Sequence, residues 1–565
     1  MLCALVGLAA LPVSSRADVQ AQSPQASGRD LETNLCTGQL LMSDPQTGPS
    51  WNGWGNGSAN ARFQPRSQGK LTASDLNRLQ LEWAFGYANV SSARPQPTIA
   101  GGRLFAASEN GHVYALNPKT GCRYWTYEAL AGIPTAAVVG RYRAADGTDG
   151  FGVFFGDRKA NAYAVDAQTG KLIWVRKVDS HPAAAITGAL AYDNGRVFVP
   201  VQGLNEEAKD GFAGYPCCTF RGSLSALDAN TGVLLWKTYT VAESMPRPPS
   251  QDGTPAYGPA GGGIWSAPTV DSERRLVYVS TGNGYAEPAQ STTDAVLALD
   301  INTGELKWLR QMAPNDARSD FDLSAPPMLV RLGGRQLLVV PQKSGMAWAL
   351  DPAKLGTVVW QYRFGKGSVL GAQWGMAVEG DDAYVGVADL VTQTPGGLRA
   401  LALSDGHLVW EKPPQTRLCG FGPGCNAGQG GPLTAIPGAV LSGGMDGGLR
   451  AYSTKDGSIL WSFDTNKDFD TVNGVKANGG SMDSAGPVVV DGMLYVTSGS
   501  GGPTGRPGNV LLAFGLPSCP GCRLSRPSPF APGPARASAS PAPGATRTTG
   551  RAGPTALARS RVPST

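Results

Sequence analysis

The stretch Ala226-Leu-Asp-Ala-Asn-Thr-Gly-Val-Leu-Leu-Trp236 decides the fold of this 565-residue chain. It returns as Ala298-Leu-Asp-Ile-Asn-Thr-Gly-Glu-Leu-Lys-Trp308, and related versions occupy residues 115–125, 164–174, 349–360, 400–410 and 451–461. Alternating apolar residues lead into a polar corner whose Gly accepts a positive φ, and a branched or aromatic run then ends at Trp. This order is typical of a strand, a tight turn and a second strand. A repeating unit with room for four short strands predicts a β-propeller.

The tryptophans that end the repeats give the number of blades. Eight occur in the same phase: Trp83, Trp125, Trp174, Trp236, Trp308, Trp360, Trp410 and Trp461. The strand at 79–85 has the Trp without a preceding turn, and the strand at 509–515 has no following Trp strand, so the two complete one blade. Pairing the chain ends closes the ring and hides its edges. We predict an all-β protein, an eight-bladed β-propeller of four-stranded antiparallel blades with tryptophan-docking repeats.

Composition changes along the chain predict its domain organisation. Residues 2–11 are apolar and small residues near Ala17 resemble a cleavage site, as in a secretory signal peptide. The basic n-region of such a signal is missing. No later run of about 18 apolar residues occurs, so we expect no membrane span in the mature protein. We predict a periplasmic or secreted protein with these parts: a signal segment at 1–17, a flexible lead-in at 18–50, the propeller at 51–516 and a disordered Pro/Arg-rich tail at 517–565.

The net charge of +5 does not indicate a nucleic-acid partner. The tail at 517–565 contains seven Arg and no Lys, Asp or Glu, so the rest of the chain carries a net charge of −2. A nearly neutral body offers no basic surface for a phosphate backbone. We therefore expect no nucleic acid among the partners.

Six of the nine cysteines fall within the lead-in and the propeller, and this even number suits an oxidising compartment. Cys419 and Cys425 are spaced for a short disulfide loop, and Cys36 is paired with Cys122 by elimination. Adjacent cysteines such as Cys217 and Cys218 bridge only as a strained ring, and the alternative is that each pairs elsewhere, with Cys36 or Cys122. No Cys-x-x-Cys-His occurs, so the chain carries no haem c of its own.

The repeat around an eight-bladed ring resembles the propellers of quinoproteins, the dehydrogenases that use pyrroloquinoline quinone (PQQ). Four segments look more specifically like the polyvinyl-alcohol-dehydrogenase-like branch: Tyr215–Leu224, Ile264–Pro268, Val277–Asn283 and Asp470–Val475. The similarity runs from about Trp51 to Gly515. It implies PQQ and Ca²⁺ as cofactors, an alcohol as substrate, with secondary alcohols and polymers such as polyvinyl alcohol among the candidates, and a separate cytochrome c as electron acceptor.

The resemblance assigns cofactor-binding roles to residues in the long spacers. Trp265, which follows three glycines and lies outside the phase of the repeat, is similar to the tryptophan on which the quinone stacks; the alternative is a ninth packing Trp. A Cys217-Cys218 ring is similar to the disulfide over the other face of the cofactor. Asn283 resembles the family's neutral Ca²⁺ ligand, a reasonable donor to a hard cation, although Asn is equally suited to a turn.

The next segments provide the candidate catalytic groups. Asp322 is aligned with the family's base, which takes the alcohol proton, and it is also a candidate metal ligand. Asp320 could exchange roles with it, and either Asp could simply cap a turn. Lys343 resembles the cation that hydrogen-bonds the quinone oxygens and stabilises charge on them, against the alternative of a solvated surface Lys.

The chain departs from the family pattern at two positions. Where better-known alcohol quinoproteins have a Glu for Ca²⁺ this chain has Cys217, so Glu206 or Glu207 would have to replace it from a loop. The expected cofactor-binding Arg is also missing, with Arg141 or Arg158 as candidates.

The main rival to an alcohol dehydrogenase is a non-catalytic propeller that binds envelope proteins or peptides. A second rival is a degenerate family member that binds the quinone poorly.

Overall fold

The computed structural model describes residues 34–38, 41–204, 206–207, 214–314, 320–372, 374–420, 422–501 and 504–517. The predicted signal at 1–17 and nearly all of the predicted tail lie outside the described residues. Everything described belongs to one compact unit that ends at Pro517. The boundaries proposed from the sequence at 17, 50 and 516 therefore stay predictions.

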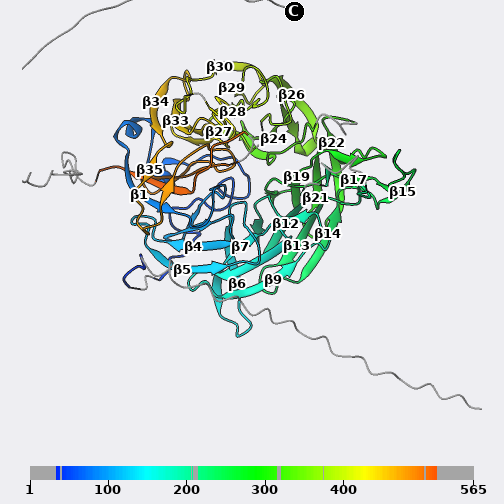
Figure 1. Cartoon of the computed structure of the whole chain (residues 1–565), viewed down its shortest axis with the longest axis horizontal. Helices are drawn as coiled ribbons and strands as arrows, with labels where there is room; N and C mark the ends of the chain where they lie inside the picture. Colours follow the sequence, from blue (N-terminus) through cyan, green and yellow to red (C-terminus); the bar gives the residue numbers. More distant parts are fainter. Residues whose placement is uncertain are drawn as a thin grey trace, which may run out of the picture. The chain divides into compact units, whose positions relative to one another are not determined.

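Eight antiparallel sheets follow one another around a ring (Figure 1). Their strands, numbered by blade, are as follows: in blade 1 β2 (Thr98–Ala100), β3 (Arg103–Ala107), β4 (His112–Leu116) and β5 (Arg123–Glu128); in blade 2 β6 (Val138–Arg143), β7 (Asp149–Gly156), β8 (Asn161–Asp166) and β9 (Leu172–Lys177); in blade 3 β11 (Ala191–Asp193), β12 (Arg196–Gly203), β13 (Ser223–Asp228) and β14 (Leu234–Tyr239), with β10 (Ala184–Ala185) also paired to β12; in blade 4 β18 (Thr269–Asp271), β19 (Leu276–Ser280), β21 (Ala295–Asp300) and β22 (Leu306–Gln311).

The second half of the ring repeats this arrangement. Its strands are as follows: in blade 5 β23 (Met328–Leu332), β24 (Arg335–Pro341), β25 (Met346–Asp351) and β26 (Thr357–Arg363); in blade 6 β27 (Ala377–Glu379), β28 (Asp382–Gly386), β29 (Leu398–Ala402) and β30 (Leu408–Lys412); in blade 7 β31 (Thr434–Ile436), β32 (Ala439–Gly443), β33 (Gly448–Ser453) and β34 (Ile459–Asp464); in blade 8 β37 (Val488–Val490), β38 (Met493–Ser498), β39 (Val510–Gly515) and β1 (Gln80–Gly86).

The remaining elements of the described residues are short and lie in connections between or within the blades. They are three two-stranded pairs, β15 (Met245–Arg247) with β16 (Ala256–Gly258), β17 (Ala260–Gly261) with β20 (Gly284–Ala286) and β35 (Asp468–Phe469) with β36 (Ala477–Asn478), the helix α1 (Arg66–Gly69), and the 3-10 helices η1 (Ala73–Arg78) and η3 (Pro352–Lys354). Two of the three strand pairs fall in the long spacer between Trp174 and Trp308.

The repeated sequence motif forms the contact between neighbouring blades. Trp236 at the end of one copy donates its indole N–H to the carbonyl oxygen of Ile301 in the next blade, at 3.2 Å. Its ring lies against Gly304, where a Cβ would come within 2.5 Å of the indole and where φ is +72°. Gly at this corner is therefore required twice, by the turn and by the docked Trp. The predicted tryptophan-docking repeat is confirmed.

The two chain ends complete blade 8, as predicted. β1 pairs along its length with β39, which also pairs with β38. Blade 8 has no copy of the turn, so its joint to blade 7 differs: Trp461 meets Phe514 edge-to-face, with ring centroids 5.5 Å apart. The ring is closed by strand pairing between residues that are about 430 positions apart in the chain.

A segment from Trp51 to Gln64 belongs to no blade and runs past the first strands of seven of them. Backbone or side-chain hydrogen bonds join it to Ile99, Val139, Val270, Leu329, Val378, Ala435 and Val489. Arg62 in this segment is buried, stands between the rings of Trp51 and Trp54 with its guanidinium carbon 5.3 Å from each centroid, and donates to the carbonyl oxygens of Leu433 and Trp54. Burial lowers the pKa of Arg62 to about 9. The segment thus ties together the first strands of seven blades.

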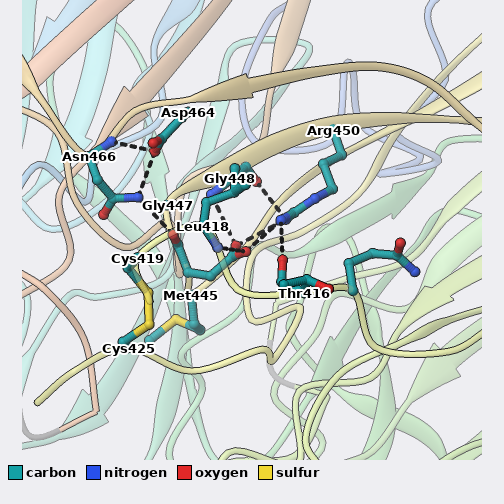
Figure 2. A network of polar contacts seen from close by, with 12 residues as sticks. Thr416, Leu418, Cys419, Cys425, Met445, Gly447, Gly448, Arg450, Asp464 and Asn466 are labelled. Atoms are coloured by element: carbon teal, nitrogen blue, oxygen red, sulfur yellow. Dashed lines mark hydrogen bonds and ion pairs between the residues drawn. A yellow bond between two sulfur atoms is a disulfide. The ribbon is translucent and has the colours of Figure 1, made fainter. Parts of the chain in front are cut away.

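All three disulfides expected from the sequence are present: Cys36–Cys122, Cys217–Cys218 and Cys419–Cys425. Figure 2 shows the last of these beside the turn between β32 and β33. There Asp446 binds Arg450 through a buried ion pair at 2.5 Å, and the same carboxylate accepts the backbone N–H of Leu418 at 3.1 Å. The disulfide loop is thus held to blade 7 through Asp446.

Candidate active site

A cavity of about 280 Å³ opens where the segments leading into the first strands meet the turns after the second strands. Loops on one end of a rigid ring are where a site is expected. The lining residues come from most of the blades: Arg94, Pro134, Arg158, Thr187, Gln202, Gly203, Leu204, Glu207, Gly263, Trp265, Gly282, Asn283, Tyr285, Asp320, Asp322, Lys343, Trp374 and Ser484. Five of the predicted site residues are brought together here: Trp265, Asn283, Asp320, Asp322 and Lys343.

Trp265 lies in the segment leading into β18 and provides an aromatic wall of this cavity. The ammonium of Lys343 stands 5.1 Å from its ring centroid, and the ring of Trp374 meets it edge-on at 5.1 Å and 86°. The glycines before Trp265 have different roles. Gly261 allows close packing of the backbone, because a Cβ there would come within 2.6 Å of the carbonyl oxygen of Asn283. Gly263 lines the cavity itself.

Lys343 lies between two carboxylates. Its Nζ is 2.7 Å from Oδ1 of Asp320 and 2.8 Å from Oδ2 of Asp322. Burial acts to lower the pKa of Lys343, but the attraction of Asp322 and Asp320 outweighs it, so the pKa lies above its usual range. Lys343 is therefore a charged ammonium fixed beside the face of Trp265, where it can stabilise negative charge on a ligand.

The two aspartates differ in their surroundings. Asp322 is buried, with 8% of its side chain exposed, and its Oδ1 accepts the backbone N–H of Asn283 at 2.8 Å while Oδ2 faces Lys343. The side chain of Asp320 is 29% exposed, and its backbone has φ of +51°. Burial and the nearby charge of Asp322 raise the pKa of Asp320 to about 7, although Lys343 acts in the opposite direction. Asp320 is the carboxylate more open to the cavity.

The structure separates the two glutamates that the sequence left as alternatives. Glu206 is buried and accepts the backbone N–H groups of Thr219 and Phe220 at 3.0 and 2.7 Å. Glu207 lines the cavity and accepts the side-chain N–H of Asn283 at 2.5 Å. Glu206 therefore holds the chain around the vicinal disulfide, and Glu207 is the carboxylate that faces the site.

The oxygen donors of Glu207, Asn283 and Asp322 are the ligand types that Ca²⁺ prefers. Asp322 and Asn283 are linked directly by a hydrogen bond, and so are Asn283 and Glu207. Within the described part of the chain, no group of three or more His, Cys, Asp or Glu side chains is gathered closely enough to hold a metal ion by itself. A cation here would depend on the amide oxygen of Asn283 as well as the carboxylates.

The vicinal disulfide forms as predicted but lies beside the cavity. Cys217 and Cys218 are buried, and both sulfurs approach the backbone oxygen of Glu206, at 3.8 and 3.9 Å. Neither cysteine is among the residues that line the cavity. Their contact with a bound cofactor stays a prediction.

Two arginines that are distant from Lys343 in the sequence also line the cavity. Arg158 makes a two-pronged ion pair with Glu109, with contacts of 2.8 to 3.1 Å, and Nε of Arg94 is 4.0 Å from the same carboxylate. Arg141, the other candidate, instead pairs with Asp44 and does not line the cavity. Of the two sequence candidates, Arg158 is the one that reaches the site.

Sequence reasoning missed Arg94, Trp374 and Asp483. Trp374 had a signal: of the chain's 13 tryptophans it is one of five outside the phase of the repeat, as is Trp265. Trp374 lines the cavity, and its indole N–H donates to Oδ1 of Asp483 at 2.9 Å. A Trp outside the docking phase in this fold is thus a candidate for the site.

Family models match two parts of the chain. The glucose/ethanol/alcohol dehydrogenase β-propeller domain family matches residues 211–363, which contain Trp265, Asn283, both aspartates and Lys343. The outer membrane protein assembly factor BamB family matches the more regular blades at 24–203 and 396–513. The regular repeats are therefore shared with an assembly-factor family, whereas the segment with the candidate site residues matches the dehydrogenases.

Whole-chain relatives are more specific. The chain is 41% identical over 523 residues to a polyvinylalcohol dehydrogenase of a Pseudomonas species, covering 87% of this chain and 81% of the relative. It is 37% identical over 531 residues to the polyvinylalcohol dehydrogenase of Sphingopyxis sp. strain 113P3, covering 86% and 80%. The structure of the quinohemoprotein alcohol dehydrogenase ADHIIG from Pseudomonas putida HK5 superposes with a TM-score of 0.65 at 18% identity, over 88% of this chain and 84% of that one, which supports the fold.

The ring and its cavity thus define a quinoprotein-type propeller. The chain belongs to the PQQ-dependent quinoprotein dehydrogenase family, in the branch of the polyvinyl alcohol dehydrogenases. It is an enzyme that oxidises an alcohol with PQQ, which decides against the non-catalytic scaffold. In the described residues, no helix is long and apolar enough to cross a membrane.

Proposed function

We propose that this enzyme oxidises a secondary alcohol, with polyvinyl alcohol as the polymeric candidate, in the periplasm, and that its electrons pass to a separate cytochrome c. The single observation that carries the site assignment is the position of Lys343 between Asp320 and Asp322, beside the face of Trp265. The polymeric substrate is proposed from the names of the two relatives at 41% and 37% identity.

The residues present fit PQQ, a flat polyanion. Trp265 offers an aromatic surface, Lys343 a fixed cation beside it, and Arg94 and Arg158 guanidinium groups for carboxylates. When bound, PQQ supplies the hydride acceptor, and the protein contributes binding, orientation and electrostatics. Lys343 would hold the cofactor's oxygens and compensate the negative charge that develops there.

The residues also fit Ca²⁺, with Glu207, Asn283 and Asp322 as the ligands. Around Lys343, the carboxylates of Glu207, Asp320 and Asp322 meet one ammonium, and a cation would offset this local excess of negative charge. The two arginines of the lining are instead paired with Glu109. When bound, Ca²⁺ would supply Lewis-acid chemistry. Oxygen-only ligands favour a hard cation over Zn²⁺.

Asp320 is the better placed general base. The carboxylate of Asp322 is engaged by the N–H of Asn283 and by Lys343. Asp320 is more exposed to the cavity, and within the described residues its carboxylate accepts a hydrogen bond from Lys343 alone. Asp320 would accept the hydroxyl proton of the alcohol, and Asp322 would keep Lys343 and Asn283 in place. The assignment we favoured from the sequence, with Asp322 as base, is the alternative that mutation distinguishes.

The test is reconstitution of the purified protein with PQQ and Ca²⁺, followed by dye reduction with secondary alcohols and with polyvinyl alcohol. We expect cofactor uptake, seen by absorbance, and turnover that requires both additions. A protein that takes up no PQQ would contradict the proposed site. Uptake with turnover of small alcohols only would remove the polymer from the proposal and leave the rest.

A further inference from the structure

We propose that Asp483 is a positioning residue for the cofactor site, which orients Trp374 and through it the ring of Trp265. Asp483 precedes β37 of blade 8, and Trp374 precedes β27 of blade 6, so the contact bridges across blade 7. The indole N–H of Trp374 donates to Oδ1 of Asp483 at 2.9 Å. This proposal rests on the proposed role of Trp265 as the surface on which the cofactor lies.

Trp374 packs against Trp265 and can hold the orientation of its ring. The two rings meet at 86° with centroids 5.1 Å apart, the edge-to-face arrangement that aromatic pairs favour. Trp374 also contacts Trp54 of the central segment, with centroids 6.3 Å apart. A rotation of Trp374 would therefore remove this edge-to-face support from Trp265.

The indole has few ways to hold this orientation without Asp483. An indole donates only through Nε1, and for Trp374 that donor is used by Asp483. Docking tryptophans such as Trp125 and Trp174 donate to backbone oxygens of the next blade, whereas Trp374 depends on a side chain. A single substitution can therefore release it without disturbing a blade joint.

The neighbourhood of Asp483 is shaped to accept a carboxylate at this place. A Cβ on Gly430 would come within 2.9 Å of Oδ1 of Asp483, so Gly leaves the room that the carboxylate occupies. Burial raises the pKa of Asp483, and the bond from Trp374 and the charge of Arg94 act against that rise. Arg94 lines the cavity, and so does Ser484, which follows Asp483 in the sequence. Asp483 thus lies next to the cavity lining, where it binds Trp374 and is influenced by the charge of Arg94.

The experiment compares Asp483→Ala, Asp483→Asn, Trp374→Phe and the double variant Asp483→Ala/Trp374→Phe. PQQ is titrated into each protein with saturating Ca²⁺, and binding is followed by quenching of tryptophan fluorescence. The near-UV circular dichroism of each cofactor-free protein reports the tryptophan environment. Thermal midpoints and far-UV spectra verify that each variant is folded.

We expect Asp483→Ala and Trp374→Phe each to weaken PQQ binding about tenfold, the equivalent of about 1.4 kcal/mol. The double variant should be no weaker than either single variant, because both remove the same hydrogen bond. Asp483→Asn should bind PQQ nearly as the wild type does, since its amide oxygen can still accept the indole N–H. Asp483→Ala should change the near-UV spectrum and Asp483→Asn should not.

Three results would overturn the proposal: wild-type affinity in Asp483→Ala, full additivity in the double variant, or an Asp483→Asn variant as weak as Asp483→Ala. If the wild type itself takes up no PQQ, the proposed function fails, while the near-UV spectra of the cofactor-free proteins still test the link between Asp483 and Trp374. Should Asp483→Ala not fold, the comparison of Asp483→Asn with Trp374→Phe decides in its place.

Discussion

Lys343 compensates one of the two aspartates beside it, and the other must be neutralised by a proton, a cation or solvent. Asp322 is the more buried and has two donors, so it is the natural permanent partner of the ammonium. Asp320 is then free to change its protonation during a reaction. Division of labour between two carboxylates with different environments is a common way to obtain a base and a structural anion in one site.

We therefore expect Asp320→Asn and Asp322→Asn to fail in different ways. Asp320→Asn should bind PQQ and Ca²⁺ nearly normally but lower kcat about 10²- to 10⁴-fold, the usual contribution of a general base. Asp322→Asn should weaken binding of the cofactors, because it removes a proposed Ca²⁺ ligand and the main partner of Lys343. Steady-state kinetics and calcium titrations separate the two, and a fully active Asp320→Asn enzyme would return the role of base to Asp322.

The raised pKa of Asp320 predicts how this residue affects stability in the cofactor-free protein. A carboxyl whose pKa is about 7 when folded and near 4 when unfolded destabilises the folded state when ionised. The penalty is complete above pH 7 and fades as the pH falls from 7 to 4. In EDTA, Asp320→Asn should thus be more stable than the wild type at pH 8, by about 1–3 kcal/mol, and equally stable at pH 4. Urea unfolding at both pH values measures the difference, and equal stability at pH 8 would contradict the shift.

At the scale of residues, the sequence could predict those that sit inside recognisable motifs. Trp265, Asn283 and Lys343 were identified this way and do meet in one cavity. Contacts that cross the ring carry no such signal, because their partners are held together by the closure of the fold: Trp374 and Asp483 are 109 positions apart. The choice between Glu206 and Glu207 likewise depends on which way adjacent side chains point along a loop.

At the scale of elements, the turn glycine and the docked tryptophan form one unit. Gly304 has φ of +72° and its missing Cβ faces Trp236, whereas Gly334, between β23 and β24, has φ of +82° and nothing within 4 Å of its missing Cβ. Both positions penalise a side chain through backbone strain, by about 1–2 kcal/mol. Only Gly304 adds a clash in a packed joint, which costs about 1–3 kcal/mol more.

Gly304→Ala should therefore lower the free energy of unfolding by about 2–5 kcal/mol, and its matched control Gly334→Ala by about 1–2 kcal/mol. Chemical denaturation followed by tryptophan fluorescence measures both changes. Equal losses in the two variants would mean that the joint yields easily and that the Gly is needed for the turn alone.

The element that the sequence did not predict is the segment from Trp51 to Gln64. It has no periodic pattern, because its residues pair one at a time with the first strands of successive blades. Its buried Arg62 binds backbone oxygens and aromatic rings and forms no ion pair with a carboxylate of the described residues. The repeat determines the fold of each blade, whereas the conformation of this segment depends on its contacts with the first strands of seven blades.

At the scale of the whole molecule, closure of the ring depends on one strand from the end of the chain. β39 lies between β1 and β38 and is buried throughout its length. Its Val, two Leu and Phe side chains contribute roughly 6–12 kcal/mol by burial, which is comparable with the total stability of about 5–15 kcal/mol expected for a domain. Without β39, β1 also loses its only partner strand among the described residues.

We expect a chain that ends at Gly508, and so lacks β39, to fail to form a cooperative propeller, whereas a chain that ends at Pro517 should keep the stability and PQQ affinity of the full chain. The second truncation removes only the part predicted from the sequence to be a disordered tail, so it serves as the control for the first. Urea unfolding, gel filtration and PQQ titration of the two truncated proteins test the expectation. A cooperative, PQQ-binding protein ending at Gly508 would show that seven complete blades and the central segment hold the ring without strand pairing between its ends. A loss of affinity on ending at Pro517 would instead assign the tail a part in the site.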